Sequence, residues 1–104
     1  PLSGQDGDHA ALNRIAKGQQ TVTVWKNATD LGVAAAKAAL ELADGTPVTG
    51  AVDIKTESGL DQPAVLLTPI AITWDNLDLV VDADWISKED LCQGVTENPP
   101  AACQ

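Results

Sequence analysis

The sequence predicts an α/β fold, a partial doubly wound parallel sheet with helices on both faces. Two observations indicate it. The composition is that of a globular protein, with 44% of the 104 residues hydrophobic, and segments typical of strands alternate three times with segments typical of helices. Such alternation is typical of a parallel sheet covered by helices. Because three strands make a thin sheet, and a parallel sheet is covered on both faces, we expect part of a doubly wound lobe.

The first strand and the first helix have clear boundary signals. Residues 1–3 have the character of the end of a strand. Asp8 is a favourable N-cap, so it predicts a helix that runs to Lys17 and stops at Gly18. The side chains expected on the buried face of this helix are Leu12, Ile15 and Ala16.

The second strand and the second helix follow directly. The β-branched residues of TVTVW, residues 21–25, predict a strand that ends in a tryptophan. Either Asn27 or Thr29 then caps a long Ala-rich helix, which runs to about Asp44 and is ended by Gly45. The buried stripe expected on this helix consists of Leu31, Ala35, Ala38 and Leu42.

A polar segment precedes the third strand. Residues 46–63 are rich in Thr, Gly, Pro and Asp, and residues 51–55 within them predict a short strand. VLLTPIAIT, residues 65–73, predicts a buried strand. Since proline cannot donate to a sheet ladder, Pro69 indicates that this strand is at an edge or changes sheet.

Two short helices and an irregular tail are expected at the C-terminal end. Asp75 is the expected cap of a helix over residues 76–82, and Ser87 with Asp90 resembles a capping box for a last helical turn. Trp74 and Trp85, which flank the first of these helices, are expected to be packing residues. The two cysteines, Cys92 and Cys103, are expected to form a disulfide, because the intervening Pro-Pro favours a chain reversal. A disulfide would indicate an oxidising compartment, and two unrelated thiols are the alternative.

Charge and motif content exclude several classes of function. The net charge of −9 argues against nucleic acid and against an anionic membrane surface as partners. DGDHA lacks the ligand spacing of a calcium loop, and the cysteine spacing is not a zinc pattern. No motif places a nucleophile near His9, so we expect no enzyme, no metal and no cofactor.

Two loops follow the carboxyl ends of the first two strands, where ligands bind in such sheets. Asp6, in the first loop, can accept two hydrogen bonds from paired hydroxyls of a sugar, although a turn residue bonded to its own backbone is the alternative. Lys26, after the second strand, would lie beside it and donate to a hydroxyl, unless it is a solvated surface lysine. Trp25 can stack on a sugar ring or belong to the core.

PLSGQDGDHAALNRIAKGQQTVTVWK resembles the C-terminal region of periplasmic sugar-binding proteins of ABC importers, in the D-xylose- and multiple-monosaccharide-binding branch. The resemblance continues through LGVAAAKAALELADG, LLTPIAIT and DNLDLVVDADWISKEDLC. The type I fold that it implies has two α/β lobes that are joined by a hinge and close over one sugar. The chain would then be a fragment of the C-terminal lobe, and Pro1 would be internal to a longer protein.

The resemblance also implies a division of the chain and a set of sugar-binding residues. Residues 1–73 would be part of the C-terminal sugar-binding lobe, with LLTPIAIT as the last hinge-crossing strand, and residues 74–104 would form C-terminal helices and a tail. Asp6 matches the aspartate that binds sugar hydroxyls in the family, and Lys26 matches a polar position that also reaches the sugar. The residues expected at the sugar are Asp6, Lys26, Gln5 and Asn27.

We therefore expect the solute-binding component of a sugar ABC transporter, which binds D-xylose or a related aldose and delivers it to a permease in the membrane. Its location would be periplasmic or extracellular, with a lipid anchor at an upstream N-terminus as one option. The missing N-terminal lobe, or a second copy of the chain, would cover apolar surface and complete the cleft. A sugar-sensing domain of a transcription regulator and a stand-alone α/β interaction module without sugar binding are the alternatives.

Overall fold

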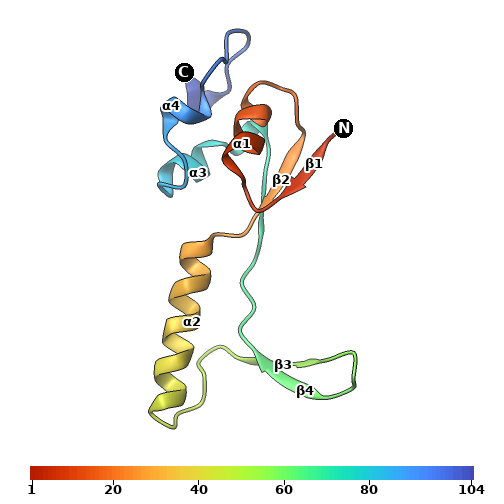
Figure 1. Ribbon diagram of the computed structural model, residues 1–104, viewed down its shortest axis with the longest axis vertical. Coiled ribbons are helices and arrows are strands. Elements are labelled where there is room, and N and C mark those ends of the chain that lie inside the picture. Colours follow the sequence, from red (N-terminus) through yellow and green to blue (C-terminus); the bar gives the residue numbers. More distant parts are fainter. The chain divides into compact units, whose positions relative to one another are not determined.

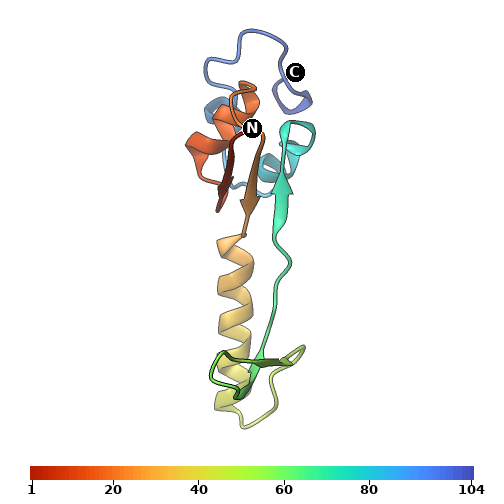
Figure 2. The same ribbon diagram turned by 90° about the vertical axis from the view of Figure 1, so that its right-hand side faces the viewer.

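The computed structural model describes all 104 residues, which form two compact units (Figures 1 and 2). Unit 1 comprises Pro1–Lys26 and Pro69–Gln104, and unit 2 comprises Asn27–Thr68. The chain leaves unit 1 after Lys26 and returns to it after Thr68, so two linking passages join the units. Each unit has a sheet of its own. No helix of the structure has the length and apolar character needed to cross a membrane.

The sheet of unit 1 has the strand order β1-β2-β5, formed by β1 (Ser3–Gln5), β2 (Val22–Trp25) and β5 (Ile70–Ile72). β1 and β2 are parallel, whereas β2 and β5 are antiparallel. An α/β fold is therefore present, but the expected all-parallel sheet is wrong at β5. A parallel third strand needs a crossover that returns the chain to the starting edge of the sheet. Here the chain reaches β5 from unit 2 and enters the sheet in the opposite direction.

The strand expected at residues 65–73 is much shorter than predicted. Only Ile70–Ile72 pairs in the sheet, and the preceding residues are extended without strand partners. Ile72 is fully buried, but Leu66 is 66% exposed, so the expectation of a buried strand is wrong over residues 65–69. These residues form the passage between the two units, which explains why they lack ladder partners, and Pro69 has no N–H to offer one.

Helix α1 (His9–Ala16) forms as its sequence predicts. The carboxylate of Asp8 caps it by accepting a hydrogen bond from the Ala11 N–H at 3.2 Å. Gly18 follows the helix with a φ of 70°, which glycine adopts without strain. The expected apolar face is buried and joins side chains of the sheet and of the C-terminal helices in one core: Leu12, Ile15, Ala16, Trp25, Ile72, Leu77, Val80, Ile86 and Leu91.

Short helical segments complete unit 1. A 3-10 helix, Trp74–Asn76, precedes α3 (Asp78–Asp82), and α4 (Lys88–Leu91) follows. The expected cap at Asp75 is wrong. The turn begins instead after Thr73, whose N–H donates to Oδ1 of Asn76 at 2.7 Å.

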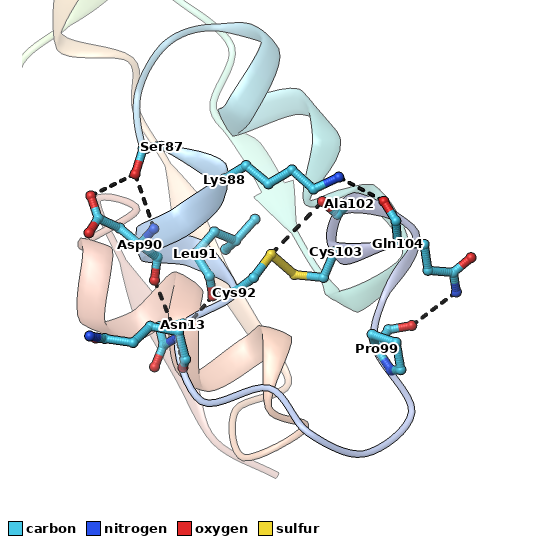
Figure 3. The surroundings of a disulfide bond; sticks show 11 residues. Asn13, Ser87, Lys88, Asp90, Leu91, Cys92, Pro99, Ala102, Cys103 and Gln104 are labelled. Carbon is cyan, nitrogen blue, oxygen red and sulfur yellow. Dashed lines mark hydrogen bonds between the residues drawn. A yellow bond between two sulfur atoms is a disulfide. The ribbon is translucent and has the colours of Figure 1, made fainter.

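The tail is fastened to α4 by the predicted disulfide between Cys92 and Cys103, which confirms that pairing (Figure 3). Ser87 caps α4 as expected, because its Oγ accepts from the Asp90 N–H at 3.0 Å. Asn13 of α1 donates to the carbonyls of Leu91 and Gln93, both at 2.9 Å. These contacts hold α4 and its following turn against α1.

Unit 2 consists of helix α2 (Ala28–Ala43) and a hairpin of β3 (Val52–Lys55) and β4 (Asp61–Ala64). Asn27 caps α2 by accepting from the Thr29 N–H at 3.0 Å. The predicted strand at residues 51–55 is present. Its partner β4 was not predicted, since most of it falls in the polar segment of residues 46–63. Pro63 is compatible with β4 because in a two-stranded sheet proline can face the open edge.

The stripe expected to be buried on α2 is not buried in this structure. Leu31 is 48% exposed, Leu42 is 66% exposed, and no residue of α2 is buried. The four residues of this stripe do share one side of the helix, where they line an open apolar groove. However, a two-stranded hairpin and short loops supply too little surface to cover a helix of 16 residues.

The loop after α2 is fastened to the helix by Glu41. Its two carboxylate oxygens accept from the N–H of Thr49 at 2.9 Å and from the hydroxyl of Thr49 at 2.7 Å. These hydrogen bonds favour the ionised form, so they lower the pKa of Glu41 below its ordinary value.

Candidate functional site

The loop after β1 has an unusual backbone that is held against β2. Asp6 and Gly7 are both in the left-handed region, with φ values of 73° and 66°. The N–H of Asp6 donates to the Val24 carbonyl at 2.7 Å, and the N–H of Gly7 donates to Oγ1 of Thr23 at 3.3 Å. The parallel pairing of β1 and β2 is thus continued by one hydrogen bond past the end of β1, and the loop turns there.

Three of the four expected sugar-binding residues lie together at this edge. Nζ of Lys26 is 2.8 Å from Oδ1 of Asp6 and 3.3 Å from Oε1 of Gln5. Strand direction explains the proximity, because β1 and β2 are parallel and their carboxyl ends meet at one edge of the sheet. Asn27 is the next residue in the chain, but it belongs to unit 2 and its side-chain oxygen caps α2.

The pair formed by Asp6 and Lys26 is open to solvent. Their side chains are 71% and 42% exposed. An exposed ion pair contributes about 0–1 kcal/mol to stability, so a ligand can replace it at small cost. The carboxylate can accept hydrogen bonds from two hydroxyls, while the ammonium donates to a hydroxyl or ring oxygen. An exposed pair of this kind is suited to binding a polyhydroxylated molecule.

Two tryptophans, Trp25 and Trp85, contact the loop at Gly7. Trp25 is only 4% exposed, so it belongs to the core and is not available as a stacking platform in this structure. Its ring lies against Trp85, with centroids 5.7 Å apart and planes at 60°. A Cβ on Gly7 would lie 2.6 Å from Cδ1 of Trp25, so the close approach of the loop to this ring requires a glycine.

Trp85 has a role at the loop that the sequence did not reveal. Its Nε1–H donates to the carbonyl of Gly7 at 2.7 Å, and its own carbonyl accepts from Nε2 of His9 at 2.7 Å. The sequence predicted packing for Trp85, and the side chain does pack against the core. Nothing in the local sequence signals a contact with a loop so distant along the chain.

No group of three or more His, Cys, Asp or Glu side chains lies together as metal ligands. Unit 1 also has a hollow of about 920 Å³, but none of the four expected residues lines it. That hollow is open to solvent, and it is lined by the N-terminal residues, the turn before β2 and the turn after β5. Its lining residues include Pro1, Leu2, Gln19, Thr21, Trp74 and Asn98.

Comparisons with known proteins show what the chain as a whole is similar to. The chain matches no protein-family model. It is 43% identical over 89 residues to the D-xylose-binding periplasmic protein of Escherichia coli and 40% identical over 84 residues to that of Haemophilus influenzae. These matches cover 85% and 80% of this chain but only 26% and 25% of the relatives. The chain therefore spans about a quarter of the length of the relatives that it matches.

A solved structure is also similar. It is the crystal structure of a carbohydrate transporter solute binding protein from Chloroflexus aurantiacus in complex with D-glucose, with a TM-score of 0.76 and 29% sequence identity. The match covers 85% of this chain and 26% of that chain. The resemblance to sugar-binding periplasmic proteins of the D-xylose-binding branch is confirmed, and the chain is homologous to part of these proteins.

Proposed function

We propose that the chain is a segment of the solute-binding component of a sugar ABC transporter, and that the longer protein binds a monosaccharide between two lobes. D-xylose or a related aldose is the proposed ligand. The observation that carries the proposal is the exposed pair of Asp6 and Lys26, at the carboxyl ends of adjacent parallel strands. The homology to D-xylose-binding periplasmic proteins supports the same ligand class.

The proposed contacts follow from hydrogen-bonding capacity. Asp6 accepts from two neighbouring hydroxyls of the sugar, Lys26 donates to a third oxygen, and the amide of Gln5 lies beside them. A hydrogen bond to a charged group contributes about 1.5–3 kcal/mol, so two such bonds exceed the small stabilisation lost with the ion pair. Asn27 is proposed to contribute from the adjacent position through its side-chain amide.

The two passages between the units support a hinged, two-lobed protein. We infer that residues 65–73 contain the last crossing of the hinge, since the boundary after Thr68 lies within them, and that the crossing itself is made by the unpaired residues before β5. Residues 74–104 would then complete the lobe that contains β1 and β2. Unit 2 would belong to the other lobe, which modifies the expectation that all of residues 1–73 lie in the C-terminal lobe. Binding would proceed by closure of the lobes over the sugar.

The proposed location is the periplasm or the cell exterior, with a permease in the membrane as the partner that receives the sugar. The relatives are periplasmic proteins by name, and the disulfide of this chain fits an oxidising compartment. A lipid anchor on an upstream N-terminus is compatible with this location. We propose no catalytic activity and no cofactor.

The test begins with the intact mass of the protein as its source cells produce it. We expect a mass several times the 10.8 kDa of this chain. Calorimetric titration of that protein with D-xylose, D-glucose and D-galactose should then give saturable one-to-one binding of at least one aldose. Xylitol, which has the hydroxyls but cannot form a ring, is the matched control and should bind much more weakly. A protein that binds none of these aldoses contradicts the proposal.

A further inference from the structure

We propose that Trp85 is a positioning residue for the sugar-binding loop, because its indole N–H holds the Gly7 carbonyl and thereby fixes the carboxylate of Asp6 for the ligand. The inference rests on the proposed function, since the loop's task is taken to be sugar binding. It adds a residue from the segment between α3 and α4, far from the loop in sequence. The hydrogen bond itself is short, at 2.7 Å.

The loop benefits from such a restraint because its backbone conformation is uncommon. Asp6 has a φ of 73°, in the left-handed region that aspartate adopts more readily than most residues but that remains uncommon outside glycine. The following Gly7 is left-handed as well, so two successive residues depart from the extended conformation of β1. A conformation of this kind persists only where surrounding contacts hold it.

Contacts from two directions hold the loop. From β2, the Val24 carbonyl accepts from the N–H of Asp6, and Oγ1 of Thr23 accepts from the N–H of Gly7. From the opposite end of the chain, Trp85 donates to the carbonyl of Gly7. Both polar backbone groups of Gly7 are therefore engaged, which fixes the peptide groups on either side of it. Because the peptide group between Asp6 and Gly7 is fixed, the backbone conformation at Asp6 is restrained as well.

Trp85 is itself held rigidly, so it can serve as an anchor. Nε2 of His9 donates to the Trp85 carbonyl at 2.7 Å, and the indole ring packs on Trp25. The two tryptophans have different roles. Trp25 approaches Gly7 with its carbon atoms, and its buried Nε1 has no hydrogen-bond partner. Of the two tryptophans, only Trp85 forms a side-chain hydrogen bond to the loop.

The experiment uses the longer sugar-binding protein and the aldose that it binds best in the panel above. Trp85→Phe keeps an aromatic ring but removes the N–H donor. Trp74→Phe is the matched control, because Trp74 is also partly buried against the core but lines the hollow away from the loop. Dissociation constants and melting temperatures are measured for both variants, for Asp6→Asn and for the double variant Asp6→Asn/Trp85→Phe.

The loss of one neutral hydrogen bond should weaken sugar binding by about three- to tenfold in Trp85→Phe, whereas Trp74→Phe should bind as the unaltered protein does. If Trp85 acts through Asp6, the double variant should bind sugar about as weakly as Asp6→Asn alone. Such non-additivity of dissociation constants is expected of coupled residues. A lower melting temperature with unchanged affinity would show a merely structural role and overturn the inference.

Two further outcomes would contradict the inference about Trp85. Weakening by Trp85→Phe that is equally large in the Asp6→Asn background would show that Trp85 acts independently of Asp6. Absence of sugar binding by the unaltered protein would refute the proposed function, and the inference with it. Binding by the unaltered protein with equal affinity in Trp85→Phe refutes the inference alone, so the two failures are distinguishable.

Discussion

The ammonium nitrogen of Lys26 lies 2.8 Å from a carboxylate oxygen of Asp6, and the two residues extend from neighbouring parallel strands. Both side chains are substantially exposed. Because an exposed pair contributes little to folding, substitution at either residue should act on ligand binding and not on stability.

Asp6→Asn in the longer protein should weaken aldose binding by well over tenfold, because it removes the charge from an acceptor of two hydroxyl hydrogen bonds. Asparagine tolerates the left-handed backbone at this position, so the melting temperature of the sugar-free protein should barely change. Calorimetric titration and thermal unfolding measure the two quantities. Asp84→Asn is the matched control, because Asp84 is also exposed with a positive φ, of 53°. Equal affinity in the two variants would remove Asp6 from the site.

Gly7→Ala should destabilise the loop and weaken binding. The new Cβ would lie 2.6 Å from Cδ1 of Trp25, and alanine is also strained at a φ of 66°. We expect a loss of about 2–3 kcal/mol in the free energy of unfolding, from strain and overpacking together. Gly18→Ala separates the two causes, since Gly18 has a φ of 70° but no neighbour within 4 Å of the added atom. Urea unfolding that gave equal losses for both variants would show that the Trp25 contact is unimportant.

The loop after α2 should loosen in acid because of Glu41. Its pKa is lowered by the hydrogen bonds from Thr49, so its contribution to stability is present above the ordinary carboxyl pKa and is lost as the pH falls through the lowered value. An NMR titration of the side-chain carboxyl carbon should show a midpoint below that of an unperturbed Glu. Thr49→Val removes the hydroxyl donor and should raise this midpoint. A midpoint that does not move would mean that the Thr49 hydroxyl is not bonded to Glu41 in solution.

Sequence patterns predicted the features that depend on neighbours along the chain. Asp8 as a cap and the buried face of α1 follow from helix rules, and both are present. The meeting of Asp6 and Lys26 was also predictable, because each directly follows a strand and parallel strands end at one edge. Local signals were sufficient in these cases.

Features that depend on distant partners were not predictable. The periodicity of α2 marks an apolar face but not what covers it, and in this structure Leu42 is 66% exposed. The direction of β5 depends on where the chain re-enters the sheet, which its own residues do not encode. The hydrogen bond from Trp85 to Gly7 joins residues from opposite ends of unit 1, and no spacing rule describes such a contact.

The disulfide between Cys92 and Cys103 should stabilise the C-terminal segment. A cross-link that closes a loop of this size, with a separation of 11 residues, contributes about 2–3 kcal/mol by restricting the unfolded chain. The tail around Cys103 packs against the core, so opening the bond should also free that contact. Urea unfolding with and without a reductant measures the effect. The double variant Cys92→Ser/Cys103→Ser should be destabilised similarly and be insensitive to the reductant. A reductant that leaves the unaltered protein equally stable would contradict this role.

Unit 2 exposes an apolar groove that should make the isolated 104-residue chain associate with itself. The groove has a volume of about 500 Å³ and lies between α2 and the segment around the hairpin. Its apolar lining includes Leu31, Ala34, Ala35, Ala38, Leu42, Val48, Val65 and Leu67. Since exposed apolar patches drive association, we expect the chain to sediment as a dimer or larger species.

Substitutions on one helix can show whether this groove is responsible. Leu31→Gln/Leu42→Gln places polar groups in the groove and should shift the isolated chain towards the 10.8 kDa monomer in analytical ultracentrifugation. Leu40→Gln is the control, because Leu40 is 68% exposed on the same helix but does not line the groove. If the missing N-terminal lobe covers this face in the longer protein, as expected from the sequence, the double substitution there should lower the melting temperature more than Leu40→Gln does, since it buries polar groups. An equal effect of the double variant and of Leu40→Gln on association would show that general exposed apolar surface, and not this groove, drives association.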